Sequence, residues 1–314
     1  MFKAIKWFAY VAAAPMLIAP VAKAKTVNVT CGSTKINDAL KTLDPSQSNV
    51  IRVSGVCNEF VTITDFAELS VVGTNQGSSG ISGSSAGSLL WIVRSHVQIS
   101  NLTLNGGSWG VMCRDFSVCV LSENTVENAS TRGVELDNAD ATFSGDLIQN
   151  NMNAGLSMTA SRARVTKVKV LNTVAGSLNP GNGIDMQNGS ALTVEGLTVD
   201  GNAGTGVSLI GFSSLQSRPW AGEFSVTNNL SGGIWITANS SAFIGGVAVT
   251  GNQLGPDGDG AGIVITGNSS AQFWAGSTTI TGNQPGDMFC SVNGFAGGLG
   301  GVTVGSTNCA DPYQ

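Results

Sequence analysis

The stretch IWITANSSA at residues 234–242 returns almost unchanged as IVITGNSSA at residues 263–271. Each copy runs on to the same ending, Thr-Gly-Asn, at residues 250–252 and 281–283. A sequence that repeats itself about every 20–30 residues is typical of a solenoid, in which each unit buries its apolar face only against its neighbours. The repeat therefore predicts the architecture of the chain, but it does not identify a reaction or a ligand.

A glycine followed by an aliphatic residue marks this repeat along much of the chain. The seven anchors begin at Gly110, Gly133, Gly155, Gly183, Gly206, Gly233 and Gly262. An eighth position, Asp287-Met288, lacks the glycine. After each anchor the apolar residues alternate, as in Val134 and Leu136. This period of two predicts a short strand with one buried face.

Two further strands and a turn complete each unit. A second apolar position follows the anchor strand, as at Phe143, Val165 or Phe243, and a third strand follows it, as at residues 247–249. An asparagine then closes the unit, at Asn150, Asn172, Asn202, Asn228, Asn252 and Asn283. Asparagine tolerates left-handed backbone angles, and we expect stacked asparagines to bond one another. The chain is therefore predicted to be an all-β, right-handed parallel β-helix of roughly ten three-strand coils.

This pattern resembles the right-handed parallel β-helix superfamily typified by pectate lyases. It is also similar to the looser Gly-aliphatic/Asn repeat of NosD-like and alginate-epimerase-like proteins. The resemblance covers about residues 49–307 and implies a pectin lyase-like fold. It does not imply a function, because such repeats encode stacking. The motifs Asn-Thr-Asp, Asp-Asp, Gly-His-Gly, Arg-Ile-Lys and Asp-Pro-His-Glu, which the resemblance leads one to expect in its enzymes, do not occur in this sequence.

The ends of an open solenoid need covering. Apolar residues at helical spacing over residues 35–43, followed by Asp44-Pro45, predict a short helix that caps the first coil. We expect an N-terminal cap over residues 25–60 and a C-terminal cap over residues 287–314. No linker divides the chain, so residues 25–314 are predicted to form a single domain.

The first residues have the pattern of a secretory signal peptide. Lys3 and Lys6 precede an apolar run over residues 7–21, and Ala-Lys-Ala at 22–24 fits a cleavage site after Ala24. Pro15, Pro20 and the shortness of the run argue against a membrane anchor. We therefore expect residues 1–24 to direct export, so that the protein is secreted, periplasmic or on the cell surface. The style of the sequence suggests a bacterial origin.

The low and acidic charge excludes several classes of partner. Only 11% of residues are charged, and the formal net charge of −5 becomes −8 once Lys3, Lys6 and Lys23 leave with the signal peptide. An acidic exported protein is a poor candidate for binding nucleic acid or anionic membranes. We expect neither partner, nor membrane insertion, and we expect a monomer.

Six cysteines lie after the signal peptide, and export permits disulfides. They fall into three local pairs: Cys31 with Cys57, Cys113 with Cys119, and Cys290 with Cys309. Six cysteines allow about 15 connectivities, but a solenoid brings together only residues of the same or adjacent coils. Zinc is the competing interpretation, and it lacks support because there is no Cys-x-x-Cys and only one histidine.

The alternation also predicts which side chains face outward after each anchor. The outward column is Met112, Glu135, Ser157, Asp185, Ser208, Trp235, Val264 and Phe289. A second row, two residues further on, begins with Arg114 and Asp137. Neighbouring coils are about 4.8 Å apart, so this face carries acids in its early coils and apolar groups in its late coils.

Acids beside an aromatic ring are what a sugar-binding groove needs, because carboxylates hold hydroxyls or move protons and rings stack on sugars. The candidate catalytic residues are Glu135, Asp137, Asp185 and Arg114. The candidate binding residues are Trp235, Phe289 and, in the long segment at 213–222, Arg218 and Trp220. The competing interpretation is that the acids only keep a flat β face soluble.

Two functions therefore stay open. The first is a non-catalytic protein that binds extracellular polysaccharide or acts as a surface interaction scaffold. The second is a polysaccharide lyase or glycoside hydrolase that uses the acidic cluster. His96 alternates with apolar residues on an expected strand and is predicted to be an ordinary surface residue. No cofactor is expected, apart from a weak calcium signal at Asp257 and Asp259.

Overall fold

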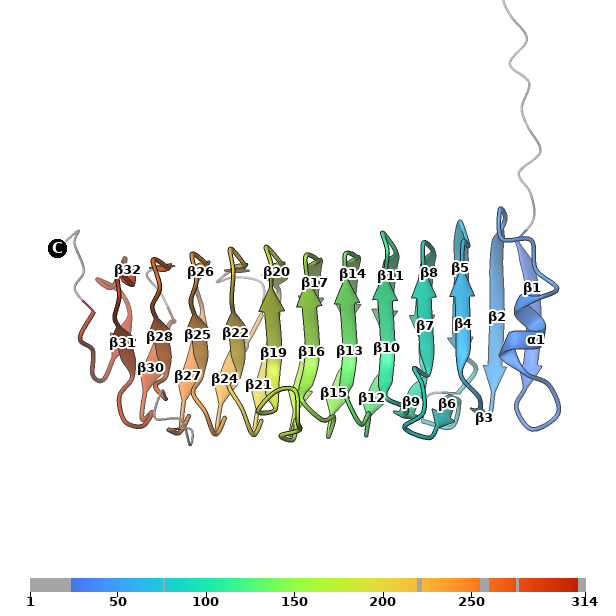
Figure 1. Cartoon of the computed structure of the whole chain (residues 1–314), viewed down its shortest axis with the longest axis horizontal. Coiled ribbons are helices and arrows are strands. Elements are labelled where there is room, and N and C mark those ends of the chain that lie inside the picture. The colour runs from blue at the N-terminus through green and yellow to red at the C-terminus, as the bar shows by residue number, and fades with distance from the viewer. Residues whose placement is uncertain (1–23, 76, 219–221, 255–259, 275–276, 310–314) are drawn as a thin grey trace, which may run out of the picture.

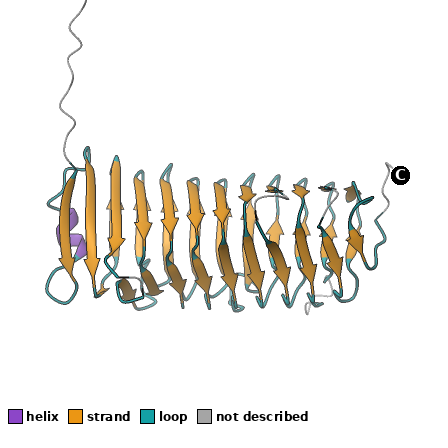
Figure 2. Ribbon diagram, turned by 180° about the vertical axis from the view of Figure 1, so that it is seen from behind, coloured by secondary structure: helices purple, strands orange, loops and turns teal. Residues whose placement is uncertain are grey.

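The computed structural model describes residues 24–309, with gaps at 76, 219–221, 255–259 and 275–276. The chain winds into coils that stack along one long axis, with the N-terminus at one end and the C-terminus at the other (Figure 1). The expected signal peptide falls outside the described residues, except for Ala24. The one helix of the described part, α1 (Ile36–Leu40), lies at the N-terminal end (Figure 2). In the described ranges no helix has the length and apolar character to cross a membrane.

Three parallel sheets run along the axis, and each complete coil contributes one strand to each sheet. The twelve-stranded sheet contains β1 (Lys25–Thr30), β2 (Ser48–Ser54), β5 (Glu68–Gly73), β8 (His96–Ser100), β11 (Val118–Ser122), β14 (Asp140–Ser144), β17 (Arg162–Thr166), β20 (Ala191–Val194), β23 (Ser214–Ser217), β26 (Ser241–Ile244), β29 (Ser270–Phe273) and β32 (Phe295–Gly297). The ten-stranded sheet contains β4 (Val61–Thr64), β7 (Leu90–Val93), β10 (Trp109–Arg114), β13 (Arg132–Asp137), β16 (Ala154–Thr159), β19 (Asn182–Gln187), β22 (Val207–Leu209), β25 (Ile234–Ile236), β28 (Ile263–Ile265) and β31 (Met288–Cys290). The eleven-stranded sheet contains β3 (Val56–Asn58), β6 (Gly80–Gly83), β9 (Thr103–Gly106), β12 (Thr125–Glu127), β15 (Leu147–Gln149), β18 (Val168–Leu171), β21 (Leu197–Asp200), β24 (Phe224–Thr227), β27 (Val247–Thr250), β30 (Thr279–Thr281) and β33 (Thr303–Val304).

The all-β parallel solenoid predicted from the repeat is confirmed, with about twelve coils where roughly ten were expected. Side chains on the inward faces form one continuous apolar core. Phe143 and Val165 point into this core as predicted, but the prediction for Phe243 was wrong. Ala242 and Ile244 take the inward positions of β26, so Phe243 faces outward and its ring lies edge-on against Trp274, 5.2 Å away. The predicted inward positions on β26 are therefore displaced by one residue.

The glycine of the repeat is required by space. A Cβ atom at Gly110, Gly155, Gly183 or Gly206 would overlap the inward valine of the same coil. A Cβ at Gly133 would lie 2.6 Å from the buried amide of Asn151. At this point the chain enters the ten-stranded sheet so close to the core that only hydrogen fits, which explains why the motif is glycine followed by an aliphatic residue.

The asparagines that close the coils occupy two different positions. Asn150, Asn172 and Asn228 adopt left-handed backbone angles, with φ of 52–54°. Asn202, Asn252 and Asn283 instead follow a glycine that takes the left-handed angle, and their side chains are buried. The sequence pattern had merged these two positions into one column.

The buried amides form a ladder of hydrogen bonds between coils. The ladder runs through Asn202, Asn229, Asn252 and Asn283 and ends on Asp287. At each step the backbone N–H and the side-chain Nδ2 of one residue both donate to Oδ1 of the next, over 2.8–3.1 Å. Each buried amide of the ladder is thus satisfied by its neighbour.

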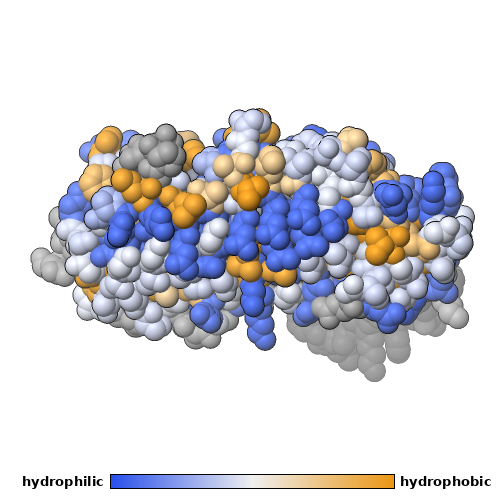
Figure 3. Space-filling model, turned by 90° about the horizontal axis from the view of Figure 1, so that it is seen from below, coloured by the Kyte–Doolittle hydropathy of each residue, from blue (hydrophilic) through white to orange (hydrophobic). Residues whose placement is uncertain are grey.

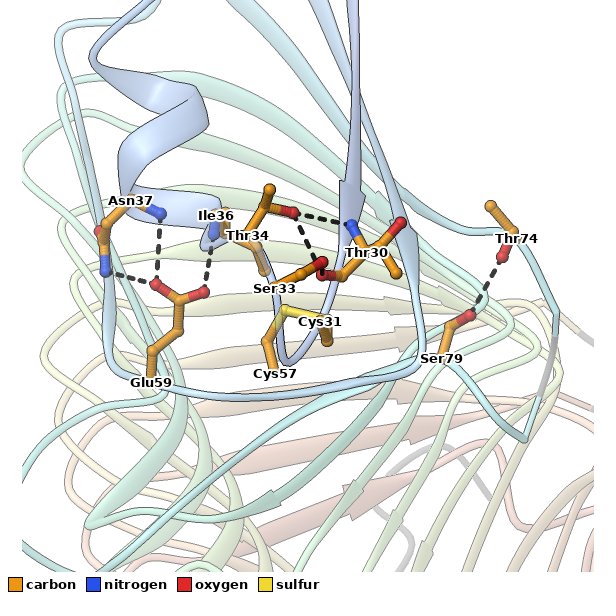
Figure 4. The surroundings of a disulfide bond; sticks show 10 residues. All are labelled: Thr30, Cys31, Ser33, Thr34, Ile36, Asn37, Cys57, Glu59, Thr74 and Ser79. Carbon is orange, nitrogen blue, oxygen red and sulfur yellow. Dashed lines mark hydrogen bonds between the residues drawn. A yellow bond between two sulfur atoms is a disulfide. The ribbon is translucent and has the colours of Figure 1, made fainter.

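The N-terminal coil is closed by α1 and by a disulfide between Cys31 and Cys57 (Figure 4). The helix is shorter than the predicted 35–43, although Leu43 is still buried. The Glu59 carboxylate accepts hydrogen bonds from the backbone N–H groups of Ile36, at 2.7 Å, and Asn37, at 3.2 Å. An acid at this position satisfies donors that the first turn of a helix leaves free.

The other two local cysteine pairs are also joined. Cys113–Cys119 spans the corner between β10 and β11, and Cys290–Cys309 holds the C-terminal segment on the last coil. Three disulfides in a chain of this kind indicate an oxidising environment.

Outside the core, the face seen from below in Figure 3 carries a band of hydrophilic side chains along the axis, with hydrophobic groups beside it.

We predict that Gly155→Ala destabilises the protein by about 1–3 kcal/mol. Its new methyl group would overlap Val170 and lie 2.8 Å from the backbone oxygen of Gly183. Gly300→Ala is the matched control, because no atom lies within 4 Å of the added Cβ there. Urea unfolding measures both variants, and equal stability of the two would refute the spatial explanation of the motif.

A second prediction concerns Asp146, which lies at the corner between β14 and β15 and is 1% exposed. Burial raises the pKa of Asp146 from 3.8 to about 6, so the folded state binds its proton more tightly than the unfolded state. The stability that this protonation contributes to the folded state is present below pH 3.8 and is lost as the pH rises through about 6. It amounts to about 2–3 kcal/mol.

Between pH 4 and pH 7 the free energy of unfolding should therefore fall less for Asp146→Asn than for the unaltered protein. Asp140→Asn, which changes an exposed acid on β14, should keep the original pH profile. Denaturant titrations at both pH values provide the measurement. The explanation fails if Asp146→Asn and Asp140→Asn give the same profile.

Candidate functional site

The outward column of the ten-stranded sheet is a continuous line of side chains. The strand register aligns Trp91, Met112, Glu135, Ser157, Asp185, Ser208, Trp235, Val264 and Phe289, one from each coil. The order is the one that the alternation predicted, extended toward the N-terminus by Trp91. Adjacent members are about 4.8 Å apart at the backbone, so Glu135 and Asp185, two coils apart, are separated by about 10 Å.

The early coils bring the predicted charged residues together. Arg114 on β10 lies beside Asp137 on β13, with 3.4 Å between Nη2 and Oδ2, and 3.5 Å separates its Nε from Oδ1 of Asp115. Glu135 forms an ion pair with Arg132, with 2.8 Å between Oε1 and Nη1. Each arginine of this cluster is therefore already neutralised by at least one carboxylate.

Glu135 and Asp185 are more buried than acids that only keep a surface soluble. They are 9% and 1% exposed. The segment after β18 contributes Asn179, whose Nδ2 lies 3.4 Å from Oδ2 of Asp185, and Gln187 Nε2 donates to the same oxygen at 2.8 Å. Burial raises the pKa of the Asp185 carboxyl, and the hydrogen bond from Gln187 and the charge of Arg132 offset part of that effect.

Trp235 lies between two hollows on this face. A pocket of about 250 Å³ is lined by Trp235 and by polar residues that include Asp185, Gln187, Asn179 and Ser208. A larger cavity of about 610 Å³ is lined by Trp235, Val264, Met288 and Phe289 together with Thr266, Ser291 and Asn308. Phe289 is 46% exposed. The indole N–H of Trp235 is buried and has no hydrogen-bond partner within the described part of the chain.

Some of the predicted residues are not part of this face. Arg218 follows β23 of the twelve-stranded sheet, and its Nη1 lies 3.7 Å from Oε1 of Glu195, away from Trp235 and its column. Trp220, Asp257 and Asp259 lie outside the described residues. His96 is exposed at the start of β8, also in the twelve-stranded sheet. In the ranges described, no group of three or more His, Cys, Asp or Glu side chains could hold a metal ion.

Sequence reasoning missed Arg132, Trp91 and Asn179. Arg132 stands directly before the Gly133 anchor, and it pairs with Glu135 although alternation places residues three apart on opposite faces of a strand. Trp91 precedes the first glycine anchor, so it was outside the aligned repeats. Its ring lies 5.4 Å from the guanidinium of Arg114. Asn179 belongs to an irregular segment whose path no periodicity predicts.

Comparison with known proteins agrees with this fold. The chain resembles the solved structure described as "Crystal structure of Dettilon tailspike protein (gp208)", with a TM-score of 0.50 at 12% identity over 89% of this chain and 68% of that one. A second, "Geobacillus virus E2 - ORF18", gives a TM-score of 0.47 at 12% identity over 86% of this chain and 58% of that one, so this chain spans less than two thirds of its length. These likenesses concern the fold alone.

No curated protein matches the chain. The family described as "Right handed beta helix region" matches residues 79–285, which is more than half of the sequence. The coils, the three parallel sheets and this match together show that the chain belongs to the right-handed β-helix family.

Proposed function

We propose that this chain is an exported β-helix protein that binds extracellular polysaccharide along the outward face of the ten-stranded sheet. The observation that carries this proposal is the position of Trp235, which lines both the pocket that contains the buried Asp185 carboxyl and the cavity that contains Phe289. A pyranose ring has an apolar face and a rim of hydroxyls. A tryptophan next to fixed carboxylate, amide and hydroxyl groups matches both.

Other features support the same reading. The three disulfides suit a protein that works outside a reducing compartment, and the expected signal peptide would take it there. The acidic charge argues against nucleic acid and anionic lipid as partners. We propose that residues 25–314 act as one unit and as a monomer. Arg218, which pairs with Glu195 on another sheet, is left out of the proposed binding face.

A panel of neutral and acidic polysaccharides, incubated with the purified protein and measured by depletion, tests this function. We expect Trp235→Ala to weaken binding to the retained polysaccharide by about 1–3 kcal/mol, because stacking on the ring is lost. Ile234→Ala should instead cost about 2–5 kcal/mol of stability, because that side chain is 1% exposed and faces the core.

Trp274→Ala is the control for the loss of a tryptophan, since Trp274 follows β29 on the twelve-stranded sheet. It should leave binding unchanged. The proposal is contradicted if the unaltered protein retains no polysaccharide. It is also contradicted if the Trp235 and Trp274 variants bind equally well. In the first case a surface interaction scaffold without a glycan ligand becomes the better account.

A second candidate function is catalysis, which the different surroundings of Glu135 and Asp185 favour. Glu135 is held in an ion pair with Arg132, whereas burial raises the pKa of Asp185. Two carboxyl groups in different surroundings on one face are what a glycosidase uses as base and acid. Their backbone separation of about 10 Å is close to the carboxyl spacing of about 6.5–9.5 Å in inverting enzymes. Arg114 and Asp137 would then position the sugar.

If turnover exists, Glu135→Gln combined with Asp185→Asn should abolish it while the fold remains intact. Reducing-end assays detect hydrolysis, and ultraviolet absorbance of unsaturated products detects elimination. Circular dichroism checks that the variant is still β-helical. Activity that survives the double substitution would place the reaction elsewhere on the molecule and would leave Glu135 and Asp185 as binding groups.

A further inference from the structure

The late part of the sequence contains no positively charged side chain. Arg218 is the last lysine, arginine or histidine, so residues 219–314 have none. Trp235 and Phe289, the two aromatic residues of the proposed binding face, both belong to this part. The carboxylate or sulfate group of an acidic sugar would therefore find no cation on the coils that carry these rings. Since the burial of an unpaired charge is costly, an uncharged sugar is favoured here.

The cavity of about 610 Å³ at this end of the face has the same character. Among the described residues, its lining contains no aspartate, glutamate, lysine, arginine or histidine. The acid closest in sequence is Asp287, which is 5% exposed, and its two carboxylate oxygens accept hydrogen bonds from Asn283 and Ser306. An occupant of the cavity would therefore contact apolar side chains and uncharged polar groups.

The apolar part of the cavity comes from neighbouring coils. Val264 on β28 and Phe289 on β31 are register partners, and Met288 lies beside them. Val264 and Met288 are buried, whereas Phe289 is 46% exposed and can contact an occupant with its ring. A volume of about 610 Å³ is typical of a site for a small molecule or a sugar unit.

Hydroxyl groups lie next to this apolar part. Thr266 and Ser291 line the cavity two residues beyond Val264 and Phe289, which is about 7 Å along a strand. Ser291 Oγ donates to Thr266 Oγ1 at 3.2 Å, so the threonine hydroxyl can still donate its own proton. Neutral donors beside an apolar surface are complementary to a carbonyl oxygen that carries a methyl group, which is the structure of an acyl substituent.

The last wall of the cavity is held in place by the C-terminal segment. Residues 306–308 line the cavity and lie beside β31 through a parallel bridge at Thr307. The backbone N–H of Cys290 donates to Oδ1 of Asn308 at 2.7 Å, and Nδ2 of Asn308 donates to the Cys290 carbonyl at 3.1 Å. The disulfide to Cys309 ties the same segment to β31. A wall fixed in this way need not be ordered when a ligand binds, which favours affinity.

We propose that this cavity binds an uncharged sugar unit that carries an acyl substituent, such as an acetamido group. The methyl group of the substituent contacts Phe289, and its carbonyl oxygen accepts a hydrogen bond from the hydroxyl of Thr266. Trp235, which lines the same cavity, stacks on the sugar ring. The inference rests on the proposed function and names the class of sugar that the bound polysaccharide contains.

The test compares three tetrasaccharides by titration calorimetry. Chitotetraose and cellotetraose have the same linkage and no charge, and they differ by the acetamido group on each ring. Tetragalacturonate carries carboxylates. The unaltered protein should bind chitotetraose about 10-fold or more tightly than cellotetraose, which is the discrimination that one additional apolar group gives in an apolar pocket. Tetragalacturonate should bind least.

Two variants test the assigned contacts. Phe289→Ala should reduce the preference for chitotetraose to about threefold or less, because the methyl group loses its apolar contact. Thr266→Val keeps the shape of the side chain and removes its hydroxyl, so it should weaken chitotetraose binding by about 3–10-fold and leave cellotetraose binding unchanged. Phe116→Ala, which changes an exposed ring at the corner between β10 and β11, is the control and should alter neither affinity.

Three results would each overturn the inference: equal binding of chitotetraose and cellotetraose, tighter binding of tetragalacturonate than of chitotetraose, or a preference that Phe289→Ala leaves unchanged. Failure of the unaltered protein to bind any of the three would overturn it as well. In all of these cases the proposed function still holds if Trp235→Ala weakens binding of the polysaccharide that the panel retains. Retention of no polysaccharide, together with no binding of chitotetraose, would overturn both.

Discussion

The structure depends on the parallel hydrogen bonding of each coil to the next. Every strand from β1 to β33 lies beside the equivalent strand of a neighbouring coil, at the fixed spacing of about 4.8 Å that this bonding imposes. Side chains at equivalent positions must therefore stack in columns. Apolar columns make the core, the amide ladder from Asn202 to Asp287 fills one corner, and glycine is needed where the chain passes closest to the interior.

The same stacking also makes the candidate site. A polar or aromatic residue on the outward side of one coil is placed within reach of its equivalents two or three coils away, however far apart they are in sequence. Asp185 and Trp235 line one pocket for this reason, although fifty residues separate them in the chain. The face then changes gradually along the axis, from ion pairs around Arg114 and Glu135 to apolar groups around Phe289. A long, graded face of this kind is suited to a linear polymer.

Two departures from the regular coil give the face its chemistry. The segment between β18 and β19 folds over the sheet, so that Asn179 contacts Asp185 and the carboxyl is taken out of water. Arg132 pairs with Glu135 on the same strand, where an ideal strand would send residues three apart to opposite faces. Asp185 is buried and Glu135 is held in an ion pair, so the two acids differ in their chemical surroundings. Binding and catalysis would both make use of that difference.

The sequence alone determined the parallel β-helix and the membership of the outward column, because these follow from short-range periodicity that each coil repeats. It also predicted a capping helix over residues 35–43, of which residues 36–40 are helical. It also placed the cysteines in three pairs, each within one coil or between adjacent coils. The prediction that Phe243 faces the core was wrong, and the left-handed and the buried asparagines were predicted as one column. Both errors arise because a shift of one residue leaves the composition of a repeat unchanged. Only the tertiary structure decided that Asp185 is buried, that Arg132 holds Glu135 and that Arg218 lies on another sheet. Those outcomes depend on irregular segments and on contacts between side chains, which packing between coils decides and no pattern within one coil predicts.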